Sequence, residues 1–128
     1  MNTFYTPEHL YISENEGTVI IGISAHLLKK AGQVCFINLP DEGDELHAGV
    51  IMGSIEGSKG VFDLVCPADC VIESVNDGRL VEPAGLGADE FLIKARLTAP
   101  VAHLLLPEEY SVLCSADNSL VPPRNREL

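Results

Sequence analysis

Short apolar segments rich in β-branched residues recur along this chain, and glycine, proline, asparagine or aspartate stands between them. Segments of this length, separated by turn-forming residues, are typical of strands in an all-β domain. We therefore expect a mainly β fold. The segments with this pattern are Thr18–Ile23, Val34–Leu39, Val50–Glu56, Val61–Cys66, Val71–Val75 and Phe91–Leu97.

Two segments depart from the strand pattern and predict short helices. Ser24 can cap a helix near residues 24–31, and Gly32 is placed to end it. Pro107 opens a second helix near residues 107–114, whose first turn carries two glutamates that complement the helix dipole. This second helix is expected to pack on the domain as a short lid.

The connections between strands carry turn signals of several kinds. Reversals are predicted at Pro40–Asp44, Cys66–Asp69 and Asn76–Gly78, where small or φ-restricted residues cluster. The segment Gly78–Glu90, with three glycines and a proline, is predicted to be a long loop. The polar, proline-bearing residues 116–128 are predicted to be a flexible C-terminal tail.

Length, hydropathy and charge exclude several classes of protein. The chain has 128 residues, of which 46% are apolar, so we expect one globular domain. No apolar run approaches the ~20 residues that cross a bilayer, and the N-terminus lacks secretory-signal features, so a monomeric cytoplasmic protein is expected. The net charge of −11, from 19 acids and 8 bases, repels phosphate backbones and argues against nucleic-acid binding.

The chain contains four cysteines, Cys35, Cys66, Cys70 and Cys114. In a reduced cytosol they are expected to be core thiols and not disulfides. Cys66 and Cys70 are four positions apart with Pro67 between them, which matches neither a Cys-x-x-Cys redox motif nor a zinc pair.

Lys59 stands among small residues between two strand-like segments. Gly57, Ser58 and Gly60 suit a tight reversal, so Lys59 is expected at the exposed tip of a β-hairpin. An exposed lysine amine is protonated at neutral pH, which makes it a poor catalytic base and a better acceptor for enzymatic acylation. Spacing alone also fits an ordinary solvated turn lysine.

The residues around this lysine match a known attachment segment. Glu56 precedes Lys59 by three positions and Asp63 follows it by four, as around the modified lysine of the glycine cleavage system H-protein family, which this window resembles. Collinear similarities run from Tyr5–His9 to the segment at 108–110. The resemblance implies a lipoyl/biotinyl-type barrel-sandwich hybrid over residues 3–115, with lipoic acid attached covalently to Lys59.

A biotinyl carrier is the alternative with the same attachment geometry. Biotinyl domains usually flank their lysine with methionines, whereas Ser58 and Gly60 flank Lys59, so attachment of a lipoyl group is favoured. The resemblance implies a non-catalytic carrier, modified by a lipoate ligase or lipoyl transferase, that shuttles an aminomethyl or other intermediate between the glycine cleavage P, T and L proteins. Recognition around the attachment site is assigned to Glu56, Gly57, Ser58, Gly60 and Asp63.

The sequence departs from the family at its N-terminus, where His9-Leu10-Tyr11 replaces the typical His-Glu-Trp. The missing acid, beside an attachment hairpin that matches the family better, suggests an H-like paralogue; lipoate relay, redox defence and sulfur oxidation are its alternative roles, and glycine cleavage is kept as the leading assignment. An unmodified module that docks a basic partner through its acidic surface is a further alternative. His26 is expected either to line the cleft for the arm or to be a partly exposed helix histidine. His9, His47 and His103 are scattered and show no metal-ligand spacing.

Overall fold

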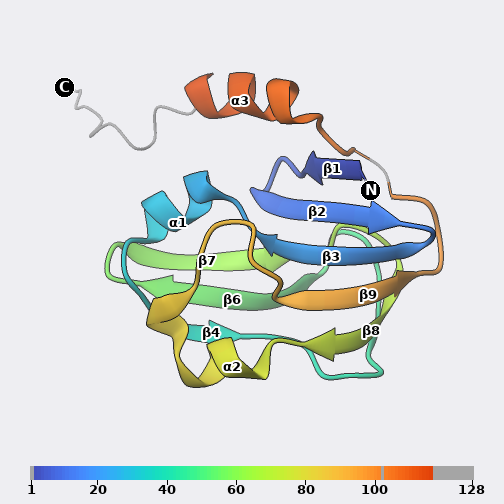
Figure 1. Cartoon of the computed structure of the whole chain (residues 1–128), viewed down its shortest axis with the longest axis horizontal. Coiled ribbons are helices and arrows are strands. Elements are labelled where there is room, and N and C mark those ends of the chain that lie inside the picture. Colours follow the sequence, from blue (N-terminus) through green and yellow to red (C-terminus); the bar gives the residue numbers. More distant parts are fainter. Residues whose placement is uncertain (1, 102, 117–128) are drawn as a thin grey trace.

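The computed structural model describes residues 2–101 and 103–116, which form two antiparallel sheets with short helices at their margins (Figure 1). The larger sheet has the strand order β1-β2-β3-β9-β8-β5, and the smaller has the order β4-β6-β7. The strands are β1 (Asn2–Tyr5), β2 (Leu10–Asn15), β3 (Thr18–Ile23), β4 (Val34–Asn38), β5 (Glu45–Leu46), β6 (Ile51–Gly57), β7 (Gly60–Val65), β8 (Cys70–Val75) and β9 (Ile93–Leu97).

The predicted mainly β class is confirmed, and the six predicted strands correspond to β3, β4, β6, β7, β8 and β9. Three strands were missed. β1 is an edge strand without a fully buried residue, which pairs with β2 and bridges to Leu105 through Tyr5, and β5 has two residues, so neither has an apolar period to detect. β2 does alternate: Leu10 and Ile12 are buried while Tyr11 is half-buried.

Both predicted helices are present. α1 spans Ala25–Ala31; the Ser24 hydroxyl accepts a hydrogen bond from the Leu27 N–H at 3.2 Å, and Gly32 follows the helix with a φ of +76°. α3 spans Pro107–Ala116, so it continues past the predicted end at residue 114 and includes the first residue of the predicted tail. Residues 117–128, which carry the rest of that prediction, lie outside the described residues.

The prediction of one long loop over residues 78–90 was wrong. This segment contains α2 (Asp77–Val81) and the 3-10 helix η1 (Pro83–Gly85). The overlooked signal was Asn76, whose side-chain oxygen accepts a hydrogen bond from the Arg79 N–H at 3.3 Å and caps α2. Gly78, early in this segment, therefore did not prevent a short capped helix from forming.

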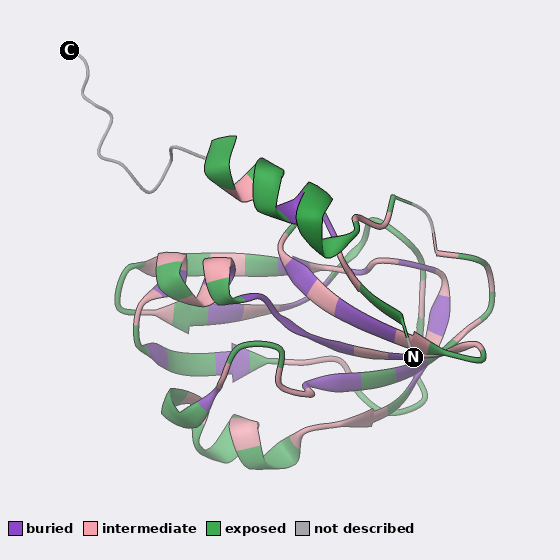
Figure 2. Cartoon of the chain, turned by 45° about the horizontal axis from the view of Figure 1, so that its top comes forward, coloured by how far each residue is buried: buried purple, intermediate pink, exposed green. Residues whose placement is uncertain are grey.

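One apolar core lies between the two sheets. Ile12, Ile21 and Ile93 from the larger sheet and Ile55 and Leu64 from the smaller are each at most 1% exposed. In Figure 2 buried residues follow the strands, whereas α2 and α3 are mostly exposed. None of the helices in the described ranges is long and apolar enough to cross a lipid bilayer.

The four cysteines are free thiols, but they are not all core residues. Cys66 and Cys70 are buried as predicted, with their sulfurs 3.9 Å apart. The core assignment was wrong for Cys35, which is exposed on β4, and Cys114 is half-buried on α3.

An ion pair joins α2 to Glu90, which stands three residues before β9 begins. Arg79 Nε lies 2.7 Å from a carboxylate oxygen of Glu90, and the Gly87 N–H donates to the other oxygen at 2.8 Å. Partial burial raises the pKa of Glu90, but the hydrogen bonds from Gly87 and Arg79 outweigh it, so the pKa lies below its ordinary 4.5.

We expect Glu90→Gln to lower the free energy of unfolding by about 1 kcal/mol at pH 7, because Arg79 loses a charged partner. A carboxylate whose pKa is lower in the folded state stabilises the protein at pH values above its ordinary pKa of 4.5. This stabilisation is lost as the pH falls through the pKa of the folded state. Urea unfolding at pH 7 and pH 3 should therefore show that the difference in the free energy of unfolding between wild type and variant is smaller at pH 3. The exposed Glu82 supplies the control variant Glu82→Gln, and an equal difference at both pH values would contradict the prediction.

Candidate functional site

Lys59 lies in the two-residue connection between β6 and β7, as predicted. The antiparallel pairing of these strands continues to Gly57 opposite Gly60, which leaves Ser58 and Lys59 as the turn. In Figure 1 this turn lies at the end of the molecule beneath α1. The hairpin therefore places the lysine at an outer edge of the domain.

The backbone of this turn is bound to the connection between α1 and β4. The Ser58 N–H donates to the Gln33 carbonyl and the Lys59 N–H donates to the Ala31 carbonyl, both at 2.9 Å. The Ser58 hydroxyl accepts a hydrogen bond from the Gln33 N–H at 3.0 Å. These three bonds hold the turn in place, so its backbone does not extend freely into solvent as a loose loop would.

Two glycines permit this close approach. A Cβ atom on Gly57 would meet the backbone carbonyl oxygen of Ala31, the same oxygen that accepts the Lys59 hydrogen bond. A Cβ atom on Gly32 would meet the Ser58 hydroxyl, and the φ of +76° at Gly32 also disfavours other residues. Backbone contact between hairpin and helix end therefore depends on small residues at these two positions.

The side chain of Lys59 is exposed, and within the described residues no ion pair or side-chain hydrogen bond holds its ammonium group. The exposed carboxylates of Glu56 and Asp63 lie on the outward face of the hairpin, because Glu56 pairs with Val61 and Asp63 pairs with Ser54 in the register. The exposed amine at the turn therefore has two acidic groups further along the strands, on the same outward face.

A shallow cavity of about 310 Å³ lies beside the turn, between the hairpin, the start of β4 and η1. Its lining residues are Gln33, Val34, Cys35, Ser58, Pro83 and Ala84. Pro83 and Ala84, in the segment that was predicted to be a loop, therefore form one wall of this cavity.

The histidine expected near the start of the first helix, His26, lies beside His9, with ring centroids 4.8 Å apart. Treating His9 as one of several scattered histidines was wrong, because the β1–β2 connection brings it to the start of α1. Leu10, at the position where the family carries its acid, is 1% exposed and belongs to the core, so it offers no polar group to a cleft.

A double-sheet β domain that presents one free lysine on a rigid exposed hairpin has the architecture of lipoyl- and biotinyl-type carrier domains. The family profile described as "Glycine cleavage H-protein" matches residues 3–110. The chain belongs to the glycine cleavage H-protein family, whose members are non-catalytic carriers and not enzymes.

Individual relatives agree with this assignment. The chain is 34% identical to the glycine cleavage system H protein of Gloeobacter violaceus over 113 residues, covering 83% of this chain and 88% of the relative. It is 37% identical to that of Chromohalobacter salexigens over 123 residues, covering 91% and 94%. The crystal structure of a glycine cleavage system H protein from Mycobacterium marinum is similar with a TM-score of 0.78 and 30% identity, covering 87% of this chain and 94% of that one.

Proposed function

We propose that this chain is the lipoyl carrier of a glycine cleavage system and that Lys59 is its attachment residue. The observation that carries the proposal is the exposed Lys59 side chain on a turn whose backbone is hydrogen-bonded to the α1–β4 connection. A modifying enzyme needs free access to the amine and a defined position for it, and this turn supplies both.

The residues around the turn fit an attached lipoyl group. The amine is unpaired within the described residues, and Ser58 and Gly60 add little bulk beside it. Acylation requires the ammonium to lose a proton and the amine to attack the carbonyl carbon of ATP-activated lipoate (the lipoyl adenylate), so that the amide bond forms, AMP leaves and the lysine becomes neutral. The bound group would supply the sulfur chemistry, while the protein would supply position and exposure.

The partners follow from this role. A lipoate ligase or lipoyl transferase would modify Lys59, and the glycine cleavage P, T and L proteins would use the loaded arm, with an aminomethyl group as cargo. Glu56 and Asp63, exposed on the outer face of the hairpin, are proposed as recognition groups for the modifying enzyme. Gly57, Ser58 and Gly60 would act by shaping the turn.

Intact-mass measurement tests the proposal. The purified full-length protein, incubated with a lipoate ligase, lipoate and ATP, should gain the mass of one lipoyl amide. A protein that stays unmodified under conditions that modify another H protein would overturn the proposal and favour an acidic interaction module.

The buried Leu10 favours a second candidate, an H-like carrier that is lipoylated but serves a different set of enzymes. The two candidates separate when the lipoylated protein is incubated with the P protein and glycine. An aminomethyl mass added to the lipoylated chain supports the glycine cleavage role, whereas lipoylation without this further addition supports the H-like carrier.

A further inference from the structure

Two histidines and a cysteine that are far apart in the sequence meet at one place on the surface. One ring nitrogen of His9, one of His26 and the sulfur of Cys114 all lie within 4.8 Å of one another, and all three residues are half-buried. His9 comes from the β1–β2 connection, His26 from the first turn of α1 and Cys114 from the last turn of α3. The cluster therefore joins three separate segments.

The backbone fixes the direction of His9. Its φ of +76° is unusual for a residue with a side chain, and it is held there by hydrogen bonds on both sides. The His9 N–H donates to the Thr6 carbonyl at 2.9 Å, and the His9 carbonyl accepts from the Ser24 N–H at 3.1 Å. The imidazole is thus anchored beside the start of α1, where His26 lies.

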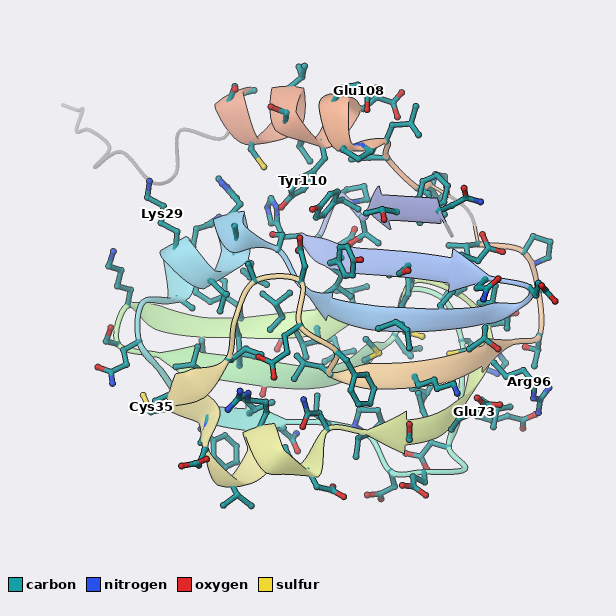
Figure 3. All side chains as sticks on the ribbon, viewed as in Figure 1. Lys29, Cys35, Glu73, Arg96, Glu108 and Tyr110 are labelled. Atoms are coloured by element: carbon teal, nitrogen blue, oxygen red, sulfur yellow. The ribbon has the colours of Figure 1, made fainter. Side chains whose placement is uncertain are left out.

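A hydroxyl group supports the His9 ring in the manner of a metal site. The Tyr110 hydroxyl lies 2.7 Å from His9 Nδ1 and 2.7 Å from the Ser24 hydroxyl oxygen. Figure 3 shows Tyr110 reaching from α3 toward the region between α1 and β2. Histidines that bind metals usually bond their second ring nitrogen to such an oxygen, and the Tyr110 hydroxyl is placed to play this part for His9.

Tyr110 and Cys114 are four residues apart on α3, so they lie on the same face of the helix. The supporting hydroxyl and the sulfur ligand consequently approach the two histidines together. Tyr110 is also the single buried residue of α3, which makes this face the main attachment of the helix to the domain.

We propose that His9, His26 and Cys114 form a three-ligand Zn²⁺ site, with solvent as the fourth ligand. Imidazole nitrogens with a thiolate are a donor set that Zn²⁺ prefers. Tetrahedral ligands with bond lengths of about 2.0–2.3 Å stand about 3.3–3.6 Å apart, so side-chain shifts of about 1 Å would complete the site. Binding would release the Cys114 thiol proton to solvent.

Titration with Co²⁺, a coloured substitute for Zn²⁺, tests the site. The full-length protein is used without a histidine tag, unlipoylated so that no dithiol competes, and in a thiol-free reductant. We expect one Co²⁺ per chain, a thiolate-to-cobalt charge-transfer band, and loss of that band when Zn²⁺ displaces the cobalt. Zn²⁺ should also raise the unfolding temperature, because it binds the folded state selectively.

Variants assign the band to these residues. Cys114→Ser should abolish it, while Cys35→Ser, which removes an exposed thiol outside the cluster, should leave it unchanged. Tyr110→Phe, which keeps all three ligands, should weaken Co²⁺ binding by about 10–100-fold. A wild-type protein without a charge-transfer band, or a band that survives Cys114→Ser, would overturn the proposal whatever the stability of the other variants.

Discussion

Replacing Lys59 with arginine is expected to abolish lipoylation completely. Arginine keeps the positive charge and the long side chain, so the hairpin and its surroundings should be undisturbed. The guanidinium cannot be deprotonated in a protein and does not act as the nucleophile that forms an amide. Intact mass after incubation with a lipoate ligase should therefore show the wild type fully shifted by one lipoyl group and Lys59→Arg unshifted.

The other lysines provide the control. The chain has four, and Lys29 is also exposed, on the neighbouring helix α1, so Lys29→Arg is a matched substitution that should leave lipoylation at the wild-type level. A mass shift that persists in Lys59→Arg would place the modification on another lysine and contradict the assignment. Peptide mapping of the shifted protein would then identify that lysine.

Gly57→Ala is expected to lower the free energy of unfolding by about 2–4 kcal/mol and to slow lipoylation as well. The added Cβ atom would meet the Ala31 carbonyl oxygen, a backbone atom that cannot rotate away, so hairpin and helix end must separate. That same oxygen accepts the Lys59 N–H, and separation would weaken the bond that positions the turn. Urea unfolding gives the stability, and amide exchange at Lys59 reports the local effect.

Gly78 offers the matched control for this substitution. It lies in α2, where an added Cβ atom would come no closer than 3.4 Å to the Asn76 side chain. Gly78→Ala should therefore be neutral or stabilising by up to about 1 kcal/mol, because alanine favours helix and restricts the unfolded chain. Equal losses of unfolding free energy in the two variants would indicate a general cost of replacing glycine. They would contradict the explanation that the added Cβ atom collides with the Ala31 carbonyl oxygen.

The sequence predicted the elements that carry strong local signals. The hairpin at Lys59 was predictable because its two small flanking glycines stand between strand-like segments, and α1 because Ser24 and Gly32 mark its ends. The edge strand β1 could not be predicted in this way, since it is held by pairing with β2 and has little buried surface of its own.

The features that depend on tertiary contact were not predictable. Nothing local indicates that the Lys59 N–H bonds to Ala31, because that contact joins separate elements. The cluster of His9, His26 and Cys114 was missed for the same reason: metal-ligand spacing in a sequence reveals only ligands that lie on neighbouring turns or hairpins. Cys35 was misplaced because an exposed thiol on an outer strand face has no distinguishing sequence pattern.

Because hydrogen bonds to Ala31 and Gln33 fix the backbone of the turn, the only mobile part of a modified Lys59 is the side chain with its attached group. The far end of such a tether sweeps a volume centred on one fixed point of the domain. Its effective concentration at a partner's active centre is therefore determined by how the body of the protein docks. Substitutions on the docking face, far from the lysine, would then change the rate of transfer as strongly as changes to the tether itself.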